Sequence, residues 1–233
     1  MQKKLFLAFL LFFVGANLFA ETGEAYHGAN FFKIRPGARA NSLGLAYLGF
    51  SDDTATVFWN PAGIVTLNGS SFMGGISSNL GFDQLSAYAG WVVKGSSFGM
   101  GFGGFLTHYP SIQGYDSLGA ETKDIFNIQG YGVLDFSFYL TDFSSMGVGV
   151  KGGYQRLGDK NLYVLGGNLG LMLQFLYFQF VLSLENMGIS VKSEDQKTQY
   201  LNPDLSFGIS YTKNTTEGDK SFGISFVASK GVD

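Results

Sequence analysis

After Asn68 the chain becomes a series of short segments in which apolar residues alternate with glycine or polar residues, and this period of two residues constrains the fold most. In residues 98–103, for example, Phe and Met alternate with Gly, and in residues 134–140 Leu and Phe alternate with Asp, Ser and Tyr. Successive side chains of a β-strand point to opposite faces, so each segment predicts a strand with one apolar face and one small or polar face. The pattern predicts nine strands, near residues 72–80, 85–93, 98–103, 134–140, 146–151, 165–173, 178–184, 205–211 and 222–226.

Turn-forming residues lie between these segments. Short turns are predicted at residues 94–96, 141–144, 158–161 and 214–219, where Gly, Asp, Asn and Ser gather. Tyr109 to Asp124 and Ser190 to Asn202 are longer and more polar, and we expect them to be loops. The result is an all-β chain of short antiparallel strands.

Composition favours a transmembrane β-barrel over other all-β folds. The 233 residues include 34 Gly and 24 Phe, and only 14% are charged. A membrane barrel uses such residues because one face of each strand meets lipid and the other meets a packed or wet interior. A soluble β-sandwich rich in Phe is the alternative. The net charge of -3 gives no basic surface for nucleic acid, and the absence of Cys excludes disulfides and thiol catalysis.

The first 20 residues have the pattern of a secretory signal peptide. Lys3 and Lys4 precede an apolar run of about ten residues, and Leu18-Phe19-Ala20 offers a cleavage point before Glu21. The run is too short for a spanning helix, although an uncleaved N-terminal anchor is the alternative. We therefore divide the chain into a signal peptide (1–20), an N-terminal hatch or plug segment (21–68) and transmembrane β-barrel strands (69–233), and expect export to the outer membrane of a diderm bacterium.

The segment before the strands has its own local signals. Pro36 and Gly37 indicate a turn, and residues 38–48 suit a short helix or a strand. Ser51 or Asp52 is predicted to cap a helix of one or two turns over residues 54–59. Asn60-Pro61 would end this helix, and Gly63 would then let the chain turn sharply towards the first strand.

Several short motifs in this segment, in this order after a signal peptide, resemble a known family. They are Gly37-Ala38-Arg39-Ala40, Leu43-Gly44, Asp52-Asp53 and Trp59-Asn60-Pro61-Ala62-Gly63. Together they resemble the N-terminal region of FadL-like outer-membrane proteins, which include long-chain fatty-acid transporters and the PorV-type proteins. Weaker likeness continues in residues 149–151, 168–170, 184–188 and 203–208, so it extends over most of the mature chain.

The resemblance implies a hatch that plugs a barrel and shifts to admit an apolar ligand. The hatch and ligand residues would be Phe58, Trp59, Asn60, Pro61, Ala62 and Gly63. Asn60 would hold the hatch through its amide, Pro61 would stiffen it, and Phe58 and Trp59 would offer apolar contact. The plain alternative is that Trp59 to Gly63 only ends a helix.

A carboxylate ligand would need a basic partner. Lys33 and Arg39 in the hatch and Lys151 in the barrel are the candidates, and no spacing distinguishes among them.

Patterns that would indicate catalysis are missing. His27 and His108 have no ligand-like spacing, and residues 99–104 match neither a phosphate loop nor a dinucleotide fingerprint. No Gly-x-Ser-x-Gly nucleophile elbow occurs. We expect a protein that is not an enzyme and uses no metal or cofactor.

The resemblance leaves more than one function open. The first is hatch-gated uptake of long-chain fatty acids or similar hydrophobic molecules, with lipid bilayer and ligand as partners. The second is a non-transporting PorV-like protein that acts as a docking or assembly component for secreted surface proteins, and the third is a plain structural outer-membrane protein. The residues after Asn68 are too few for the larger barrel of this family, so we expect missing strands, closure as a smaller barrel, or a partner.

Overall fold

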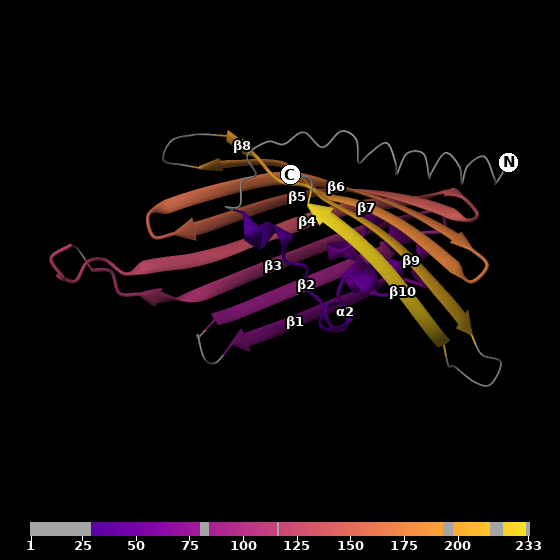
Figure 1. Ribbon diagram of the computed structural model, residues 1–233, viewed down its shortest axis with the longest axis horizontal. Coiled ribbons are helices and arrows are strands. Elements are labelled where there is room, and N and C mark those ends of the chain that lie inside the picture. The colour runs from indigo at the N-terminus through magenta and orange to yellow at the C-terminus, as the bar shows by residue number, and fades with distance from the viewer. Residues whose placement is uncertain (1–28, 80–83, 116, 193–197, 215–220, 232–233) are drawn as a thin grey trace.

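The computed structural model describes residues 29–79, 84–115, 117–192, 198–214 and 221–231. The predicted signal peptide and His27 lie outside these residues. The described chain is an antiparallel β-sheet that curves around a short N-terminal insert (Figure 1). All-β is therefore confirmed as the fold class.

Ten strands form one sheet in chain order, with β8 paired to β7 beside the main path. They are β1 (Ser71–Asn79), β2 (Gln84–Lys94), β3 (Phe98–Ile112), β4 (Ile125–Thr141), β5 (Ser144–Leu157), β6 (Lys160–Phe175), β7 (Phe178–Lys192), β8 (Thr198–Tyr200), β9 (Asp204–Asn214) and β10 (Ser221–Gly231).

The nine predicted strands correspond to all of these except β8. The structure lengthens most of them, and it corrects the two predicted loops. Strand β3 continues to Ile112, β7 continues to Lys192, and β8 forms inside the second loop. Antiparallel ladders extend these hairpins past the apolar segments, where alternation alone gives no signal.

The sheet is open among the described residues. Strands β1 and β10 are its two edges, and each pairs with one neighbour only. Of the three outcomes that we expected for the barrel, closure as a smaller barrel is therefore not what these residues form. Alternation in the sequence shows which residues of a strand share a face. It does not show whether the first and last strands of the sheet pair with each other, so closure could not be predicted from it.

The insert consists of five short helices, and its 3-10 helices lie against the inner face of the sheet (Figure 1). The five helices are the 3-10 helix η1 (Asn30–Lys33), the α-helix α2 (Ala38–Leu43), and the 3-10 helices η2 (Gly44–Gly49), η3 (Thr54–Phe58) and η4 (Pro61–Thr66). Helix η2 contacts β9 and β10, whereas η3 contacts β1 and β2. The insert thus reaches from one edge of the sheet to the other.

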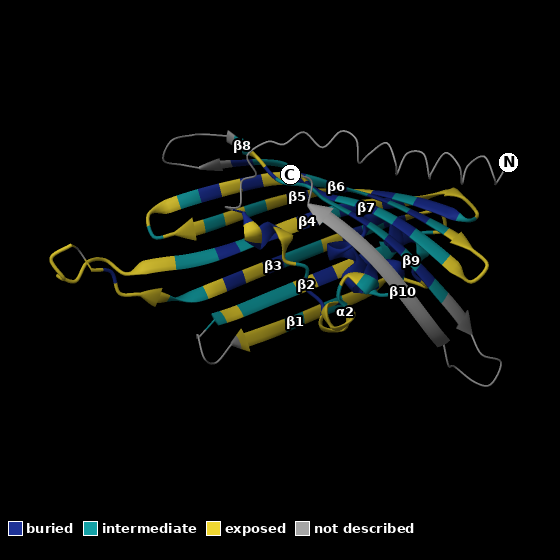
Figure 2. Ribbon diagram, viewed as in Figure 1, coloured by how far each residue is buried: buried dark blue, intermediate teal, exposed yellow. Residues whose placement is uncertain are grey.

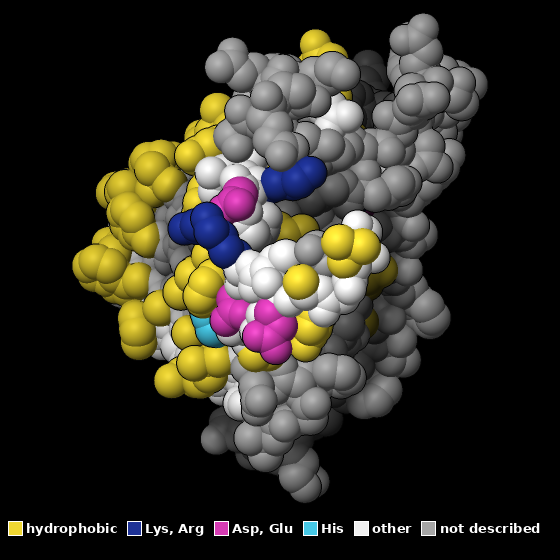
Figure 3. Space-filling view, turned by 90° about the vertical axis from the view of Figure 1, so that its left-hand side faces the viewer, with side chains coloured by type: hydrophobic (Ala, Val, Ile, Leu, Met, Phe, Trp, Pro, Cys, Tyr) yellow, Lys and Arg dark blue, Asp and Glu magenta, His cyan; other side chains and the backbone are white. Residues whose placement is uncertain are grey.

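The sheet buries its small and polar face and exposes its apolar face (Figure 2). In β4, Asp135 and Ser137 are buried, whereas Phe136 and Phe138 are exposed. Viewed from the end that carries the β3–β4 hairpin, hydrophobic side chains gather along one flank (Figure 3). Among the described residues, no helix is long and apolar enough to cross a membrane.

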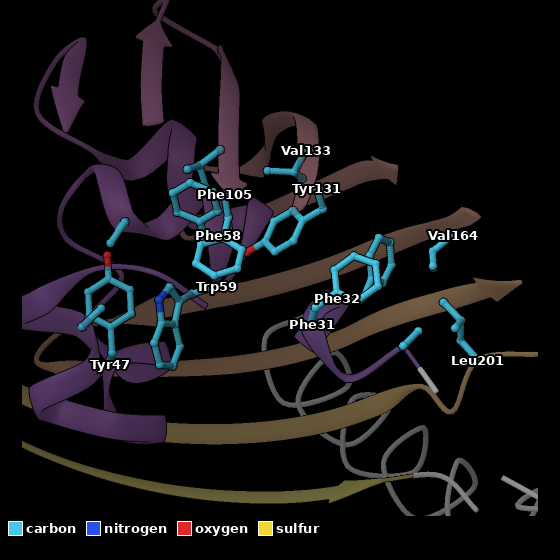
Figure 4. Close-up of a cluster of buried hydrophobic side chains, with 14 of the residues drawn as sticks. Phe31, Phe32, Tyr47, Phe58, Trp59, Phe105, Tyr131, Val133, Val164 and Leu201 are labelled. Carbon is cyan, nitrogen blue, oxygen red and sulfur yellow. The ribbon is translucent and has the colours of Figure 1, made fainter. Parts of the chain in front are cut away.

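Aromatic side chains form the centre of the core between insert and sheet (Figure 4). The ring of Tyr131 makes edge contacts with Phe32 and Phe58, at centroid distances of 6.0 and 6.3 Å. Tyr47 and Trp59 pack in the same way within the insert at 5.3 Å. Such pairs add about 0.5–1.5 kcal/mol each beyond the area they bury.

Candidate functional site between the insert and the sheet

Two side chains cap the short helices at the centre of the insert. Asp53 precedes η3 and accepts a hydrogen bond from the Ala55 amide at 2.8 Å. The predicted cap, Ser51 or Asp52, was thus wrong by one or two residues. Ser51 is buried and instead donates to the Leu48 carbonyl.

Asn60 begins a new helix rather than only ending the previous one. Its side-chain oxygen accepts from the Ala62 amide at 3.0 Å, and Pro61 occupies the first turn of η4, where a missing N–H costs nothing. Gly63 lies inside η4, so the sharp turn predicted there is wrong. A Cβ at Gly63 would lie within 3.0 Å of Thr56 and Ser51, which explains why glycine is needed there.

Glycines of the sheet form a floor under η4. A Cβ added at Gly99 or Gly101 would meet Ile64 at 2.8 and 2.7 Å. One added at Gly147 or Gly170 would come within 3.0 Å of the Asn60–Ala62 segment. Helix η4 therefore approaches the sheet more closely than any residue other than glycine at these positions would allow.

Hydroxyl groups of the sheet satisfy the backbone of η4. Ser137 and Ser145 donate to the Ala62 carbonyl at 3.2 and 2.9 Å, and Tyr139 donates to the Val65 carbonyl at 3.0 Å. The Val65 amide donates to Ser137 at 3.3 Å. Residues 60–65 are thus buried without leaving these backbone groups unpaired.

Phe58 and Trp59 also face the interior. Phe58 is 4% exposed and packs on Tyr131, as Figure 4 shows. Trp59 is 5% exposed, and its indole N–H donates to the Pro36 carbonyl at 3.2 Å. All six predicted hatch residues are therefore buried in one contact region.

The predicted basic residues already have partners in this chain. Lys33 pairs with Asp204 at 2.9 Å, and Arg39 pairs with Asp52 at 2.6 Å and Asp53 at 3.0 Å. A carboxylate ligand at either residue would have to displace one of these pairs.

Lys151 is 3% exposed and lies under η1. It donates to the Phe32 carbonyl, and its ammonium lies 4.5 and 3.9 Å from the ring centroids of Phe32 and Tyr131. Cation–π contacts of this kind partly replace lost hydration. Lys151 therefore anchors the insert rather than facing a ligand cavity.

A polar network that the sequence did not reveal joins the segment after η1 to β7 and β9. Arg35 donates to Glu185 at 3.0 Å and lies 5.2 Å from the Trp59 ring centroid. Glu185 also accepts from Ser183, and Asn186 donates to Asp204 at 3.1 Å. These groups lie far apart in sequence, so no spacing could have indicated them.

A β-bulge in β7 turns two consecutive residues inward. The register shifts between Gly167 and Leu169, and Asn186 has a φ of 59°. Glu185 and Asn186 are 3% and 1% exposed, although neighbours in a regular strand face opposite sides. The sequence does contain a signal for this bulge. Two polar residues stand next to each other at positions 185 and 186, which interrupts the alternation of apolar and polar residues.

Several buried polar groups have no hydrogen-bond partner among the described residues, and two of them lie near the insert. They are the carboxylate of Asp135, which leans over Gly149, and the side-chain nitrogen of Asn60. No group of three or more His, Asp or Glu side chains in the described part of the chain is arranged to hold a metal ion. His108 is exposed at the outer face of β3.

Three cavities in the described part of the chain do not reach the predicted hatch residues. One of about 410 Å³ is lined by residues such as Arg39, Asp52 and Gln179, and one of about 240 Å³ lies around Gly37 and Met73. A third, of about 580 Å³, lies on the outer face of the sheet. Residues 58–63 line none of these three cavities, and all six are buried.

The Tyr47 hydroxyl is hydrogen-bonded to Asp53, the residue that caps η3, so its pKa depends on this contact. Burial and the Asp53 carboxylate, which accepts from the Tyr47 hydroxyl at 2.7 Å, raise the pKa of Tyr47 above its ordinary value. The unfolded chain ionises near pH 10 while folded Tyr47 stays neutral, so this group's stabilisation is present below pH 10 and lost above it.

We expect the wild type to lose stability more steeply above about pH 10 than Tyr47→Phe does. At neutral pH the variant should be less stable by about 1 kcal/mol, the worth of one hydrogen bond. Equilibrium unfolding at several pH values in the same detergent measures both. Parallel curves for the two proteins would contradict the assignment.

No family model and no curated protein matches this chain.

Proposed function

We propose that this chain is an outer-membrane protein whose sheet lies in the bilayer with its apolar outer face toward lipid. The support is the reversed pattern of burial, in which large outer side chains such as Phe72, Ile76 and Tyr163 are 72%, 77% and 54% exposed. In water, exposed apolar surface on this scale is rare in a monomer, whereas in a bilayer it is required. The export signal at residues 1–20 and the hatch role of residues 21–68 belong to the same proposal.

Membrane insertion requires the edges β1 and β10 to be closed. Each backbone group left unpaired in hydrocarbon costs several kcal/mol, so a free strand edge is not stable there. Further strands, from the same protein or from a partner, complete the barrel in this proposal.

Within that barrel, the burial of residues 58–63 best supports a sealed, non-transporting component of the PorV-like kind. The main support is that η4 packs against the glycines of the sheet beneath it and is hydrogen-bonded to three side chains of the sheet. Such a plug leaves no apolar path along Phe58 to Gly63. The function is then docking or assembly of secreted proteins at the cell surface, without catalysis.

One observation favours hatch-gated uptake of long-chain fatty acids as the second candidate. The ion pairs that tie the insert to the sheet involve Lys33 and Arg35, and η4 itself contains no charged residue. Helix η4 can therefore leave the sheet without breaking an ion pair. A ligand that filled the vacated glycine floor would gain about 0.8 kcal/mol per buried methylene.

An uptake measurement separates the two candidates. Protein in lipid vesicles is exposed to a fluorescent long-chain fatty acid, and wild type is compared with the Asn60→Ala, Pro61→Ala double variant. If the protein is a sealed component, vesicles that contain the wild type should take up no more fatty acid than vesicles without protein. Wild-type uptake that the double variant changes would favour the transporter and overturn the sealed component.

A further inference from the structure

An apolar groove lies on the outer face of the sheet, away from the insert. Its volume is about 580 Å³, and it crosses β3 to β6. Leu106, Ile128, Tyr154 and Tyr163 form its walls, because these side chains point outward from the sheet. None of the six predicted hatch residues contributes to it.

Outward-facing glycines form the floor of this groove. Gly132 pairs with Gly152 across β4 and β5, and Gly130 lies beside Tyr154 in the next row of the ladder. A Cβ at Gly152 would meet no atom within 4 Å, and one at Gly132 would lie 3.8 Å from the nearest. Unlike Gly147 and Gly130, Gly132 and Gly152 are not needed for packing within the chain.

One end of the groove is polar. Arg156 is exposed and belongs to the row beyond Tyr154, paired with Ile128 on one side and Asn161 on the other. Two residues along a strand span about 6.6 Å, so its guanidinium can reach the mouth of the groove. It donates to the Gly158 carbonyl at 3.0 Å and has no carboxylate partner among the described residues.

Basic side chains lie directly beside the hydrophobic flank at this end of the sheet, as Figure 3 shows. The hydroxyl of Tyr154 donates to Asn161 at 2.7 Å, and the Tyr154 and Tyr163 rings lie 5.3 Å apart. Paired tyrosines with a polar tip suit the boundary between hydrocarbon and headgroups. The groove thus runs from the apolar zone to that boundary.

We propose that this groove binds one membrane lipid with a phosphate headgroup, with an acyl chain over Gly132 and Gly152 and the phosphate at Arg156. This inference depends on the membrane placement proposed above and not on the choice between docking and uptake. Charge complementarity identifies the occupant, since an arginine binds phosphate through two parallel hydrogen bonds. The open side of the groove also faces the bilayer, where phospholipid far outnumbers free fatty acid.

Native mass spectrometry tests the site with the full-length protein. The protein is released from nanodiscs made of equal parts phosphatidylglycerol and phosphatidylcholine, and retained lipid is identified by mass. We expect one phosphatidylglycerol per chain for the wild type. Arg156→Gln should lower the preference for phosphatidylglycerol about tenfold, the worth of one charged hydrogen bond.

Filling the floor with Gly132→Val and Gly152→Leu should abolish retention of either lipid. The matched control is Val148→Leu, which enlarges an outward residue of β5 outside the groove. Equal retention by all variants, or retention of free fatty acid alone, would overturn the lipid site. Failure of the wild type to enter nanodiscs would instead contradict the membrane placement.

Discussion

Gly147→Ala is expected to force η4 off the sheet and to destabilise the protein by about 3 kcal/mol. The added methyl group would lie within 3.0 Å of backbone atoms of Pro61 and Ala62, which have no rotamer with which to move away. The hydrogen bonds from Ser137 and Ser145 to the Ala62 carbonyl would be lost together. Equilibrium unfolding in detergent and protease cleavage within residues 29–67 measure the effect.

Gly152→Ala is the matched control, because it lies on the same strand with its missing side chain pointing outward into open space. It should leave stability within about 0.5 kcal/mol of the wild type and leave the insert resistant to protease. If both variants behaved alike, the close approach of η4 to the sheet would not contribute to stability.

These two glycines show where the sequence could predict structure and where it could not. Alternation located the strands and correctly assigned glycines to the face opposite the large apolar residues in β3 and β5. It could not distinguish a glycine required by η4, such as Gly147, from an outward one such as Gly152. That difference depends on contacts more than 80 residues apart, as in the bond from Ser145 to Ala62.

The insert was predicted in outline and missed in detail. The sequence indicated short helices ending near Pro61, because caps and proline act locally. It did not reveal that Asn60 begins η4, since an Asn before Pro fits both the end of one helix and the start of the next. Arg35 gave no signal at all, because its partner Glu185 lies 150 residues away in the sequence.

Glu185→Gln is expected to cost about 3–5 kcal/mol of folding free energy, because it removes one partner of a buried ion pair. The Arg35 side chain is 13% exposed and that of Glu185 is 3% exposed, so water does not replace the lost charge. Lys151, also buried nearby, would lose the same counter-charge. Glutamine preserves the volume and can still accept from Ser183, so the loss reports the charge.

Asp52→Asn is the control for this measurement, since it removes a charge from a pair whose side chains are 52% and 50% exposed. Exposed pairs contribute about 0–1 kcal/mol, so urea unfolding should separate the two variants by at least 2 kcal/mol. Adding Arg35→Met to Glu185→Gln should recover part of the loss, because it removes the buried charge left without a partner. Equal midpoints for Glu185→Gln and Asp52→Asn would mean that the Arg35–Glu185 pair does not hold the insert against the sheet, and its attachment would then depend on the other contacts of the insert, such as those of η4 and Lys151.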